Sequence, residues 1–206
     1  MSDFADIYPL VFTQGRVLER NGRTLTFTLA PAGRVSLPSG RIVACDPLTT
    51  SDLEPFVQAV IPGRYIVDLA LMREKGKGEL VAMARVRFTS KQPAVWVMAL
   101  RKGEKMSSLG PGGYFGYTSE SGTGAFMDAT AFETADFAHH DDIDALLVEL
   151  TGNYQPYRYW MEYPLDRRMN VVMFSSGDGE GRYASYFGID DGGDVCALVT
   201  DFNLLK

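Results

Sequence analysis

The chain has 206 residues, 46% of them hydrophobic and 22% charged, a composition typical of a globular protein with one domain spanning residues 1–206. Its net charge of −6 argues against a general nucleic-acid-binding protein, because such proteins use Lys and Arg to neutralise phosphates. The first residues do not form a signal-peptide pattern, and no apolar run approaches the roughly 20 residues of a membrane span. We therefore expect a cytoplasmic protein without a membrane partner.

Two β-hairpins are predicted in the first half of the chain. Residues 16–30 surround Asn21-Gly22, which favours a type I′ turn because both residues tolerate positive φ. Residues 65–72 and 80–88 alternate with period two on either side of a Lys-Gly-Lys-Gly turn, which predicts a long hairpin with one face toward the core. Shorter strands are expected at residues 41–45, 94–100 and 112–117.

The second half predicts one helix followed by strands. Four apolar residues have the i, i+3, i+4, i+7 spacing of one helical face over residues 142–151: Ile143, Leu146, Leu147 and Leu150. Strands are then expected at 170–174, 183–189 and 195–202, the last two forming a hairpin. The fold class is therefore α+β and strand-dominated, an antiparallel β-sandwich or roll with one or two helices.

Four segments in order resemble a known bacterial family. They are residues 37–48 (Leu-Pro-Ser-Gly-Arg-Ile-Val-Ala-Cys-Asp-Pro-Leu), 62–67, 122–128 and 177–202. Together they resemble domain of unknown function 4241 over residues 16–202, although residues 117–120 depart from the Gly-Val-Asp type of run expected there. The resemblance implies shared fold and a bacterial cytoplasmic setting, but no reaction; by analogy, small families of this kind often include immunity proteins that neutralise a toxin.

Carboxylates are concentrated in or beside these segments, and the candidate catalytic residues are Asp46, Asp128, Asp178 and Asp201. Several carboxylates held by loops suit a hard cation, yet the Gly-rich context equally predicts turns that the acids cap. Asp201 shares a strand face with Val199, so burial of that face would bury its carboxylate and require a partner. Arg64 and Arg41 follow glycines at strand starts and are candidate partners of Asp201 or Asp46.

An aromatic run with an arginine provides candidate binding residues. Tyr157, Arg158 and Trp160, together with Arg64, have the composition of protein-binding hot spots, although packing of a loop explains the aromatic residues equally well. The adjacent His139 and His140 precede the predicted helix and diverge in direction, and no C-x-x-C spacing is present. We expect neither a metal nor a cofactor.

Two functions of different class follow from these patterns. The preferred hypothesis is a non-enzymatic protein-binding domain, an immunity- or antitoxin-type inhibitor of a toxin-like protein partner. The alternative is a carboxylate-based or cation-dependent enzyme that uses the Asp cluster, which requires those acids to converge in one cleft.

Overall fold

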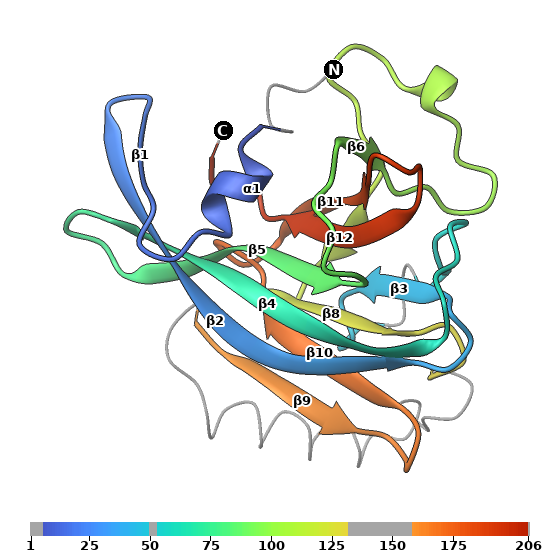
Figure 1. Cartoon of the computed structure of the whole chain (residues 1–206). Helices are drawn as coiled ribbons and strands as arrows, with labels where there is room; N and C mark the ends of the chain where they lie inside the picture. The colour runs from blue at the N-terminus through green and yellow to red at the C-terminus, as the bar shows by residue number, and fades with distance from the viewer. Residues whose placement is uncertain (1–5, 50–52, 132–157, 206) are drawn as a thin grey trace.

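The fold consists of two antiparallel β-sheets packed face to face, in a computed structural model that describes residues 6–49, 53–131 and 158–205 (Figure 1). In spatial order, the larger sheet contains β1 (Val17–Arg20), β2 (Arg23–Leu37), β4 (Gly63–Glu74), β5 (Glu79–Arg87), β12 (Val195–Asp201), β11 (Gly181–Ile189) and β6 (Val95–Met98). Strand β7 (Tyr117–Ser119) also pairs with β11. The smaller sheet contains β3 (Ile42–Cys45), β8 (Thr123–Asp128), β10 (Asn170–Ser175) and β9 (Trp160–Pro164).

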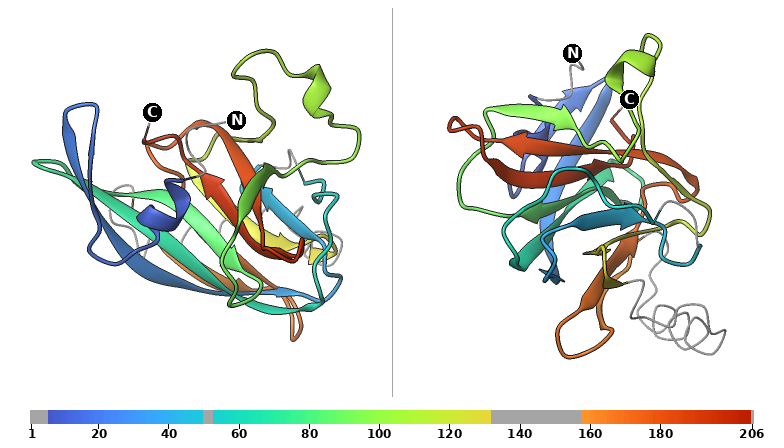
Figure 2. Two further views of the ribbon diagram at one scale, coloured as in Figure 1. Left: turned by 45° about the horizontal axis from the view of Figure 1, so that its top comes forward. Right: turned by 90° about the vertical axis from the view of Figure 1, so that its right-hand side faces the viewer.

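The strand-dominated antiparallel fold is confirmed. Two short helical segments, α1 (Tyr8–Val11) and the 3-10 turn η1 (Met106–Ser108), complete the described elements. The predicted helix over 142–151 and the two histidines before it lie outside the described residues. Figure 2 shows the two layers from the side, with β9 and β10 of the smaller sheet beneath the larger one.

Both predicted N-terminal hairpins are confirmed. Asn21 and Gly22 have φ of 51° and 73°, and the flanking Arg20 and Arg23 are paired, as a tight turn of this kind requires. The β4–β5 hairpin contains a register shift between Ala70 and Leu71. The expectation that only one of its faces lies toward the core is wrong, because the central residues of both strands are buried on both faces. Strand β2 continues much farther than expected, to Leu37, and a register shift between Pro31 and Gly33 lets it remain paired with β4.

The C-terminal hairpin is also confirmed, and its second strand lies inside the larger sheet. Strand β12 pairs with β11 on one side and with β5 on the other. The strand expected at 112–117 is displaced, because the chain pairs with β11 only from Tyr117 onward. Strands β8 and β9 were not predicted.

Three apolar clusters occupy the two faces of each sheet. The main core lies between the sheets and includes Phe126, Phe174, Phe187 and Leu198. A second cluster lies on the other face of the larger sheet, where α1 packs. A third lies on the other face of the smaller sheet. Since β10 and β12 are buried along nearly their whole length, both strands read as continuous apolar runs.

Two polar side chains from the smaller sheet bind the backbone of β2 after its register shift. The Asn170 amide accepts from Ser36 N–H (2.8 Å) and donates to the Arg34 carbonyl (2.6 Å). A Glu162 carboxylate oxygen accepts from Arg34 N–H (2.9 Å). Among the described strands, none pairs with this half of β2 on its β1 side, so the two side chains satisfy backbone groups that a strand would otherwise bind.

Candidate functional site

Asp46 is fully buried at the end of β3 and is surrounded by donors. One carboxylate oxygen accepts from the backbone N–H of Glu120 (3.0 Å) and Ser121 (2.8 Å), and the other accepts from Leu48 N–H (3.0 Å). The Ser121 hydroxyl adds bonds of 2.7 and 2.8 Å. The three bonds from backbone N–H groups do not depend on the side chains of residues 117–121.

Asp128 is fully buried at the end of β8 and is bound in the same manner. One oxygen accepts from Ser39 N–H (2.9 Å) and the Ser39 hydroxyl (2.8 Å). The other accepts from Thr130 N–H (2.9 Å) and the Thr130 hydroxyl (2.6 Å). Asp128 therefore fixes the turn that leads into β3.

Asp46 and Asp128 do not meet. Strands β3 and β8 are antiparallel, with Ile42 opposite Asp128 and Cys45 opposite Ala125. Asp46 thus lies four residues along β3 from the partner of Asp128, which corresponds to about 13 Å at the rise of a strand. The two acids hold opposite ends of one strand pair, where each organises a turn.

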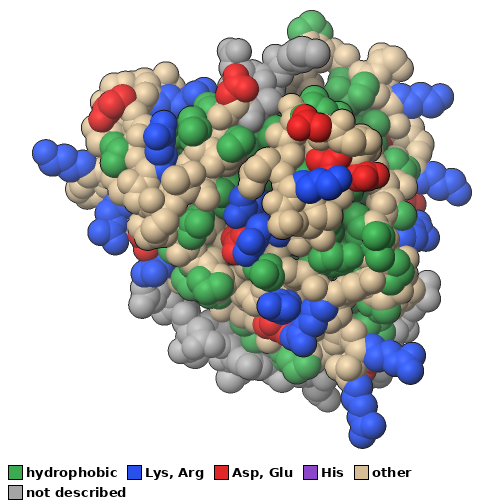
Figure 3. All heavy atoms as spheres, viewed as in Figure 1, with side chains coloured by type: hydrophobic (Ala, Val, Ile, Leu, Met, Phe, Trp, Pro, Cys, Tyr) green, Lys and Arg blue, Asp and Glu red, His purple; other side chains and the backbone are tan. Residues whose placement is uncertain are grey.

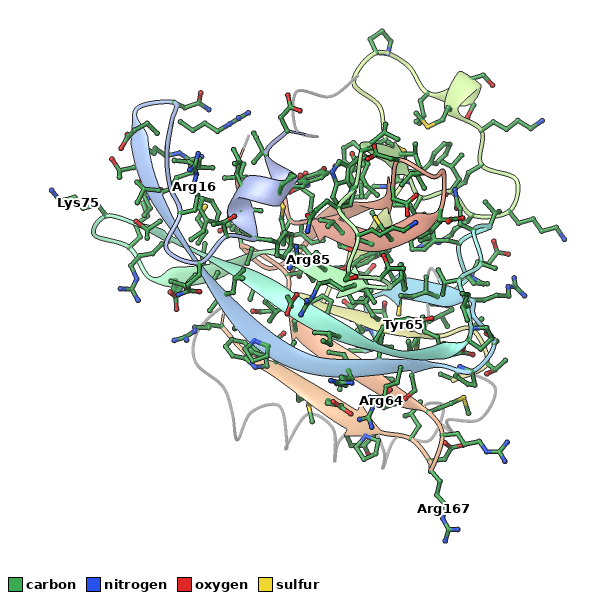
Figure 4. The ribbon with its side chains drawn as sticks, viewed as in Figure 1. Arg16, Arg64, Tyr65, Lys75, Arg85 and Arg167 are labelled. Carbon is green, nitrogen blue, oxygen red and sulfur yellow. The ribbon has the colours of Figure 1, made fainter. Side chains whose placement is uncertain are left out.

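Asp201 is buried on the predicted face, beside Val199 and beneath α1. It accepts from Asn203 N–H (2.8 Å) and lies 3.5 Å from the Tyr8 hydroxyl. Burial, followed by the negative charge of Asp201, raises the pKa of Tyr8 well above its ordinary range, so the phenol stays protonated and is able to donate. The expected pairing of Arg64 with Asp201 or Asp46 is wrong, because Arg64 pairs with Glu162 on β9 (Figure 4).

Asp178 differs from the other three acids because it is exposed, on the turn between β10 and β11. The turn is held by Gly179 N–H donating to the Ser176 carbonyl (2.8 Å) and by the Tyr183 hydroxyl, 2.8 Å from the Gly179 carbonyl. Gly177 has φ of 56°, and a Cβ there would lie 2.8 Å from the Phe202 Cβ. Glycine is therefore required for the turn to lie against the end of β12.

A cavity of about 260 Å³ opens beside Asp178, and we call it the hairpin cavity. Its lining residues come from the ends of two hairpins and from the segment after β12: Arg23, Met72, Glu74, Lys77, Gly78, Leu80, Asp178, Asn203 and Leu204. Sequence reasoning found only Asp178 among them. The other lining residues could have been suspected from the charges of Arg23, Glu74 and Lys77 at the ends of the two predicted hairpins. The order of strands in the larger sheet places these two ends side by side.

The predicted binding residues make contacts within the fold. Arg158 lies 3.1 Å from a Glu79 carboxylate oxygen, and its guanidinium is 5.6 Å from the Trp160 ring centroid. Trp160 is half-buried and packs against the main core. Arg64 pairs with Glu162, and Tyr157 lies outside the described residues. Packing thus accounts for part of the aromatic run.

Exposed apolar side chains occur instead around β6, the last strand of the larger sheet. Val95 and Val97 are 49% and 38% exposed, and the exposed Val57 lies beside the end of β6, where its N–H donates to the Leu100 carbonyl (2.9 Å). In Figure 3, hydrophobic side chains gather on this part of the face, at the position of β6 and of the segment after β3 in Figure 1.

The backbone of β6 also has an open edge. Ala99 N–H donates to the Ser185 carbonyl on β11. Because backbone groups alternate in direction along a strand, those of Val97 and Val95 also point toward β11. The backbone groups of Trp96 and Met98 point away from β11. Over the described ranges, no strand pairs with that side. We call Val57, Val95, Val97 and this edge the β6 surface.

Within residues 6–49, 53–131 and 158–205, no group of three or more His, Cys, Asp or Glu residues is arranged to hold a metal ion. No helix among these residues has the length and apolar character needed to cross a membrane.

Comparison with known proteins gives one family. No curated protein and no solved structure matches the chain. The family described as "Protein of unknown function (DUF4241)" matches residues 35–200, a stretch that contains the Asp46 and Asp128 turns, the Gly177–Asp178 turn and the β6 surface. The match covers most of the chain, which therefore belongs to the DUF4241 family.

Proposed function

We propose that this chain is a non-enzymatic protein-binding domain that acts as an immunity- or antitoxin-type inhibitor in the bacterial cytoplasm. The observation that supports this function best is the β6 surface. It combines exposed valines with a strand edge that none of the described strands pairs with, and proteins usually protect such edges with charge, proline or a covering segment.

The β6 surface suits addition of a strand by a partner. An extended segment next to β6 would bind the backbone groups of Trp96 and Met98 and place apolar side chains beside Val95 and Val97. The β11–β12 turn lies next to the start of β6 and exposes Asp191 and Asp194. A partner strand with apolar residues and a cationic residue at one end therefore fits this surface.

The alternative enzyme requires the candidate acids to converge. Asp46 and Asp128 lie at opposite ends of the β3–β8 pair, and hydrogen bonds engage both oxygens of each. Carboxylates bound in this way stabilise turns and have few lone pairs left for a substrate or a cation. The geometry of the described residues thus favours the binding protein.

The test is co-expression of the chain with toxin-like products of neighbouring genes. We expect the wild type to restore growth of cells that express its partner and to bind that partner with a sub-micromolar Kd in calorimetry. Val95→Asp should weaken binding at least about tenfold, because a buried unpaired charge is costly in an interface.

Val17→Asp is the matched control. Val17 is 51% exposed, against 49% for Val95, and it lies on β1 at the other end of the same sheet. We expect its variant to bind like the wild type. Failure of every neighbouring product to bind, or equal losses for both variants, would contradict the proposal.

A further inference from the structure

The hairpin cavity has the chemistry of a small-ligand site that is separate from the β6 surface. Strands β2 and β4 lie toward one end of the larger sheet and β6 lies at the other. The cavity has an apolar part formed by Met72, Leu80 and Leu204 and a charged part formed by two cations and two carboxylates. Apolar walls with a few converging polar groups are typical of ligand-binding cavities.

Two cationic side chains of the hairpin cavity, Arg23 and Lys77, contact one carboxylate, that of Glu74. Arg23 lies 3.6 Å from a Glu74 carboxylate oxygen and donates to the Leu204 carbonyl (3.0 Å). Lys77 lies 3.0 Å from the same Glu74 oxygen. Two cations thus share one carboxylate, which leaves capacity for a second anionic group.

Asp178 contributes the remaining carboxylate. Its turn is fixed by Tyr183 and by the contact of Gly177 with Phe202, so the chain presents Asp178 from a rigid segment. With the residues that the structure describes, Asp178 makes no hydrogen bond and no ion pair, although Arg23 and Lys77 line the same cavity. An exposed carboxylate on a rigid turn is able to accept hydrogen bonds from an ammonium group.

We propose that the hairpin cavity binds a free α-amino acid with an apolar side chain. The ligand carboxylate interacts with Arg23 and Lys77, its ammonium group interacts with Asp178, and its side chain packs against Met72, Leu80 and Leu204. The volume of about 260 Å³ lies below the range of roughly 300–1,000 Å³ typical of larger ligands, which suits a single amino acid.

The experiment is calorimetric titration of the full chain with the twenty standard amino acids. We expect leucine, isoleucine or methionine to bind with a Kd below about 1 mM, with aspartate and lysine at least about tenfold weaker. N-acetyl-leucine, which lacks the ammonium charge, and leucinamide, which lacks the carboxylate, should each lose at least about tenfold relative to leucine.

Asp178→Asn tests the assigned contact. We expect it to weaken leucine binding at least about tenfold, with Asp191→Asn, a matched change of an exposed turn acid, leaving it unchanged. Absence of binding for all amino acids up to about 10 mM, or equal affinity of Asp178→Asn and the wild type, would overturn the proposal. The partner affinity of Asp178→Asn should stay at the wild-type value, so this site and the β6 surface are tested separately.

Discussion

Asn170 is a single side chain that joins the two sheets. Its amide binds the backbone of Arg34 and Ser36, and it also donates to Glu162 (3.0 Å). Asn170 itself is buried. The three bonds explain why a polar residue starts β10, a strand that is otherwise almost wholly apolar.

We expect Asn170→Ala to lower the free energy of unfolding by about 1–3 kcal/mol, because buried backbone groups of β2 lose their partner. Urea unfolding of both proteins measures the change. Gln92→Ala, which truncates an exposed amide, should stay within about 0.5 kcal/mol of the wild type. Equal stability of Asn170→Ala and the wild type would show that water replaces the amide.

Asp190 closes the β11–β12 turn and forms an ion pair with Lys91. One oxygen lies 2.5 Å from the Lys91 ammonium, and the other accepts from the N–H groups of Gly192 (2.8 Å) and Asp194 (3.0 Å). The hydrogen bond from Lys91, followed by the backbone donors, lowers the pKa of Asp190. A lowered native pKa stabilises the fold above the ordinary carboxyl value of about 3.9, and this stabilisation is lost as pH falls through the lowered value.

Asp190→Asn should therefore be less stable than the wild type at about pH 7, and the difference should shrink as the pH falls below about 3.9. Urea unfolding of both proteins across this range measures it. Asp191→Asn, an exposed neighbour, should show little difference at any pH. A difference for Asp190→Asn that is constant with pH would contradict the assigned ion pair.

Among the elements, the hairpins could be predicted because their signals are local. Asn21-Gly22 sets the β1–β2 turn, and the Lys-Gly-Lys-Gly turn sets the pairing of β4 with β5 up to the register shift between Ala70 and Leu71. Strand β8 was missed because its partners, β3 and β10, lie far away in sequence. Strand β9 pairs with the nearby β10, but residues 165–169 between them contain no glycine that would mark a hairpin turn. Their short segments carry no turn signal comparable to Asn-Gly.

Helix α1 could not be predicted because four residues provide no helical periodicity. It nevertheless covers the second apolar cluster, where Tyr8 and Val11 are almost fully buried against residues such as Phe27, Met83 and Val199. The Tyr8 ring also contacts Trp96 edge-on, with ring centroids 5.2 Å apart. A very short helix can therefore be essential to a sheet whose face would otherwise be open.

We expect Val11→Asp to cost on the order of 3 kcal/mol or more, because a carboxylate would be buried without a partner. Thermal and urea unfolding measure the loss. Thr13→Asp introduces the same charge at an exposed position two residues later and should change stability by about 0.5 kcal/mol or less. If both variants unfolded alike, α1 would not be docked on the sheet.

For the whole molecule, the net charge of −6 is not spread evenly along the sequence. Residues 132–157 contain six Asp and Glu residues and no Lys or Arg, which equals the full net charge of −6. The rest of the chain has 20 acidic and 20 basic residues and is therefore neutral. The acidity of the chain thus does not describe the surface of the two sheets, and recognition by the β6 surface has to rest on shape, apolar contact and local charge.

The candidate acids could be predicted as residues but not as a site. Asp46 and Asp128 stand out in sequence because each follows an apolar strand, yet their separation depends on the register of β3 against β8. The hairpin cavity was missed for a similar reason, since Arg23 and Glu74 approach Asp178 only after the larger sheet has formed. Long-range strand order is the information that one sequence does not contain.

The central position of β12 has a consequence for synthesis of the protein. Strands β1, β2, β4 and β5 emerge early from the ribosome and can pair in chain order, but the free edge of β5 stays open until residues 195–201 appear. Strand β11 also gains its inner neighbour only at that point. The nascent chain must therefore protect an apolar, aggregation-prone strand edge while residues 88–194 are translated, and the larger sheet cannot close before β12 appears.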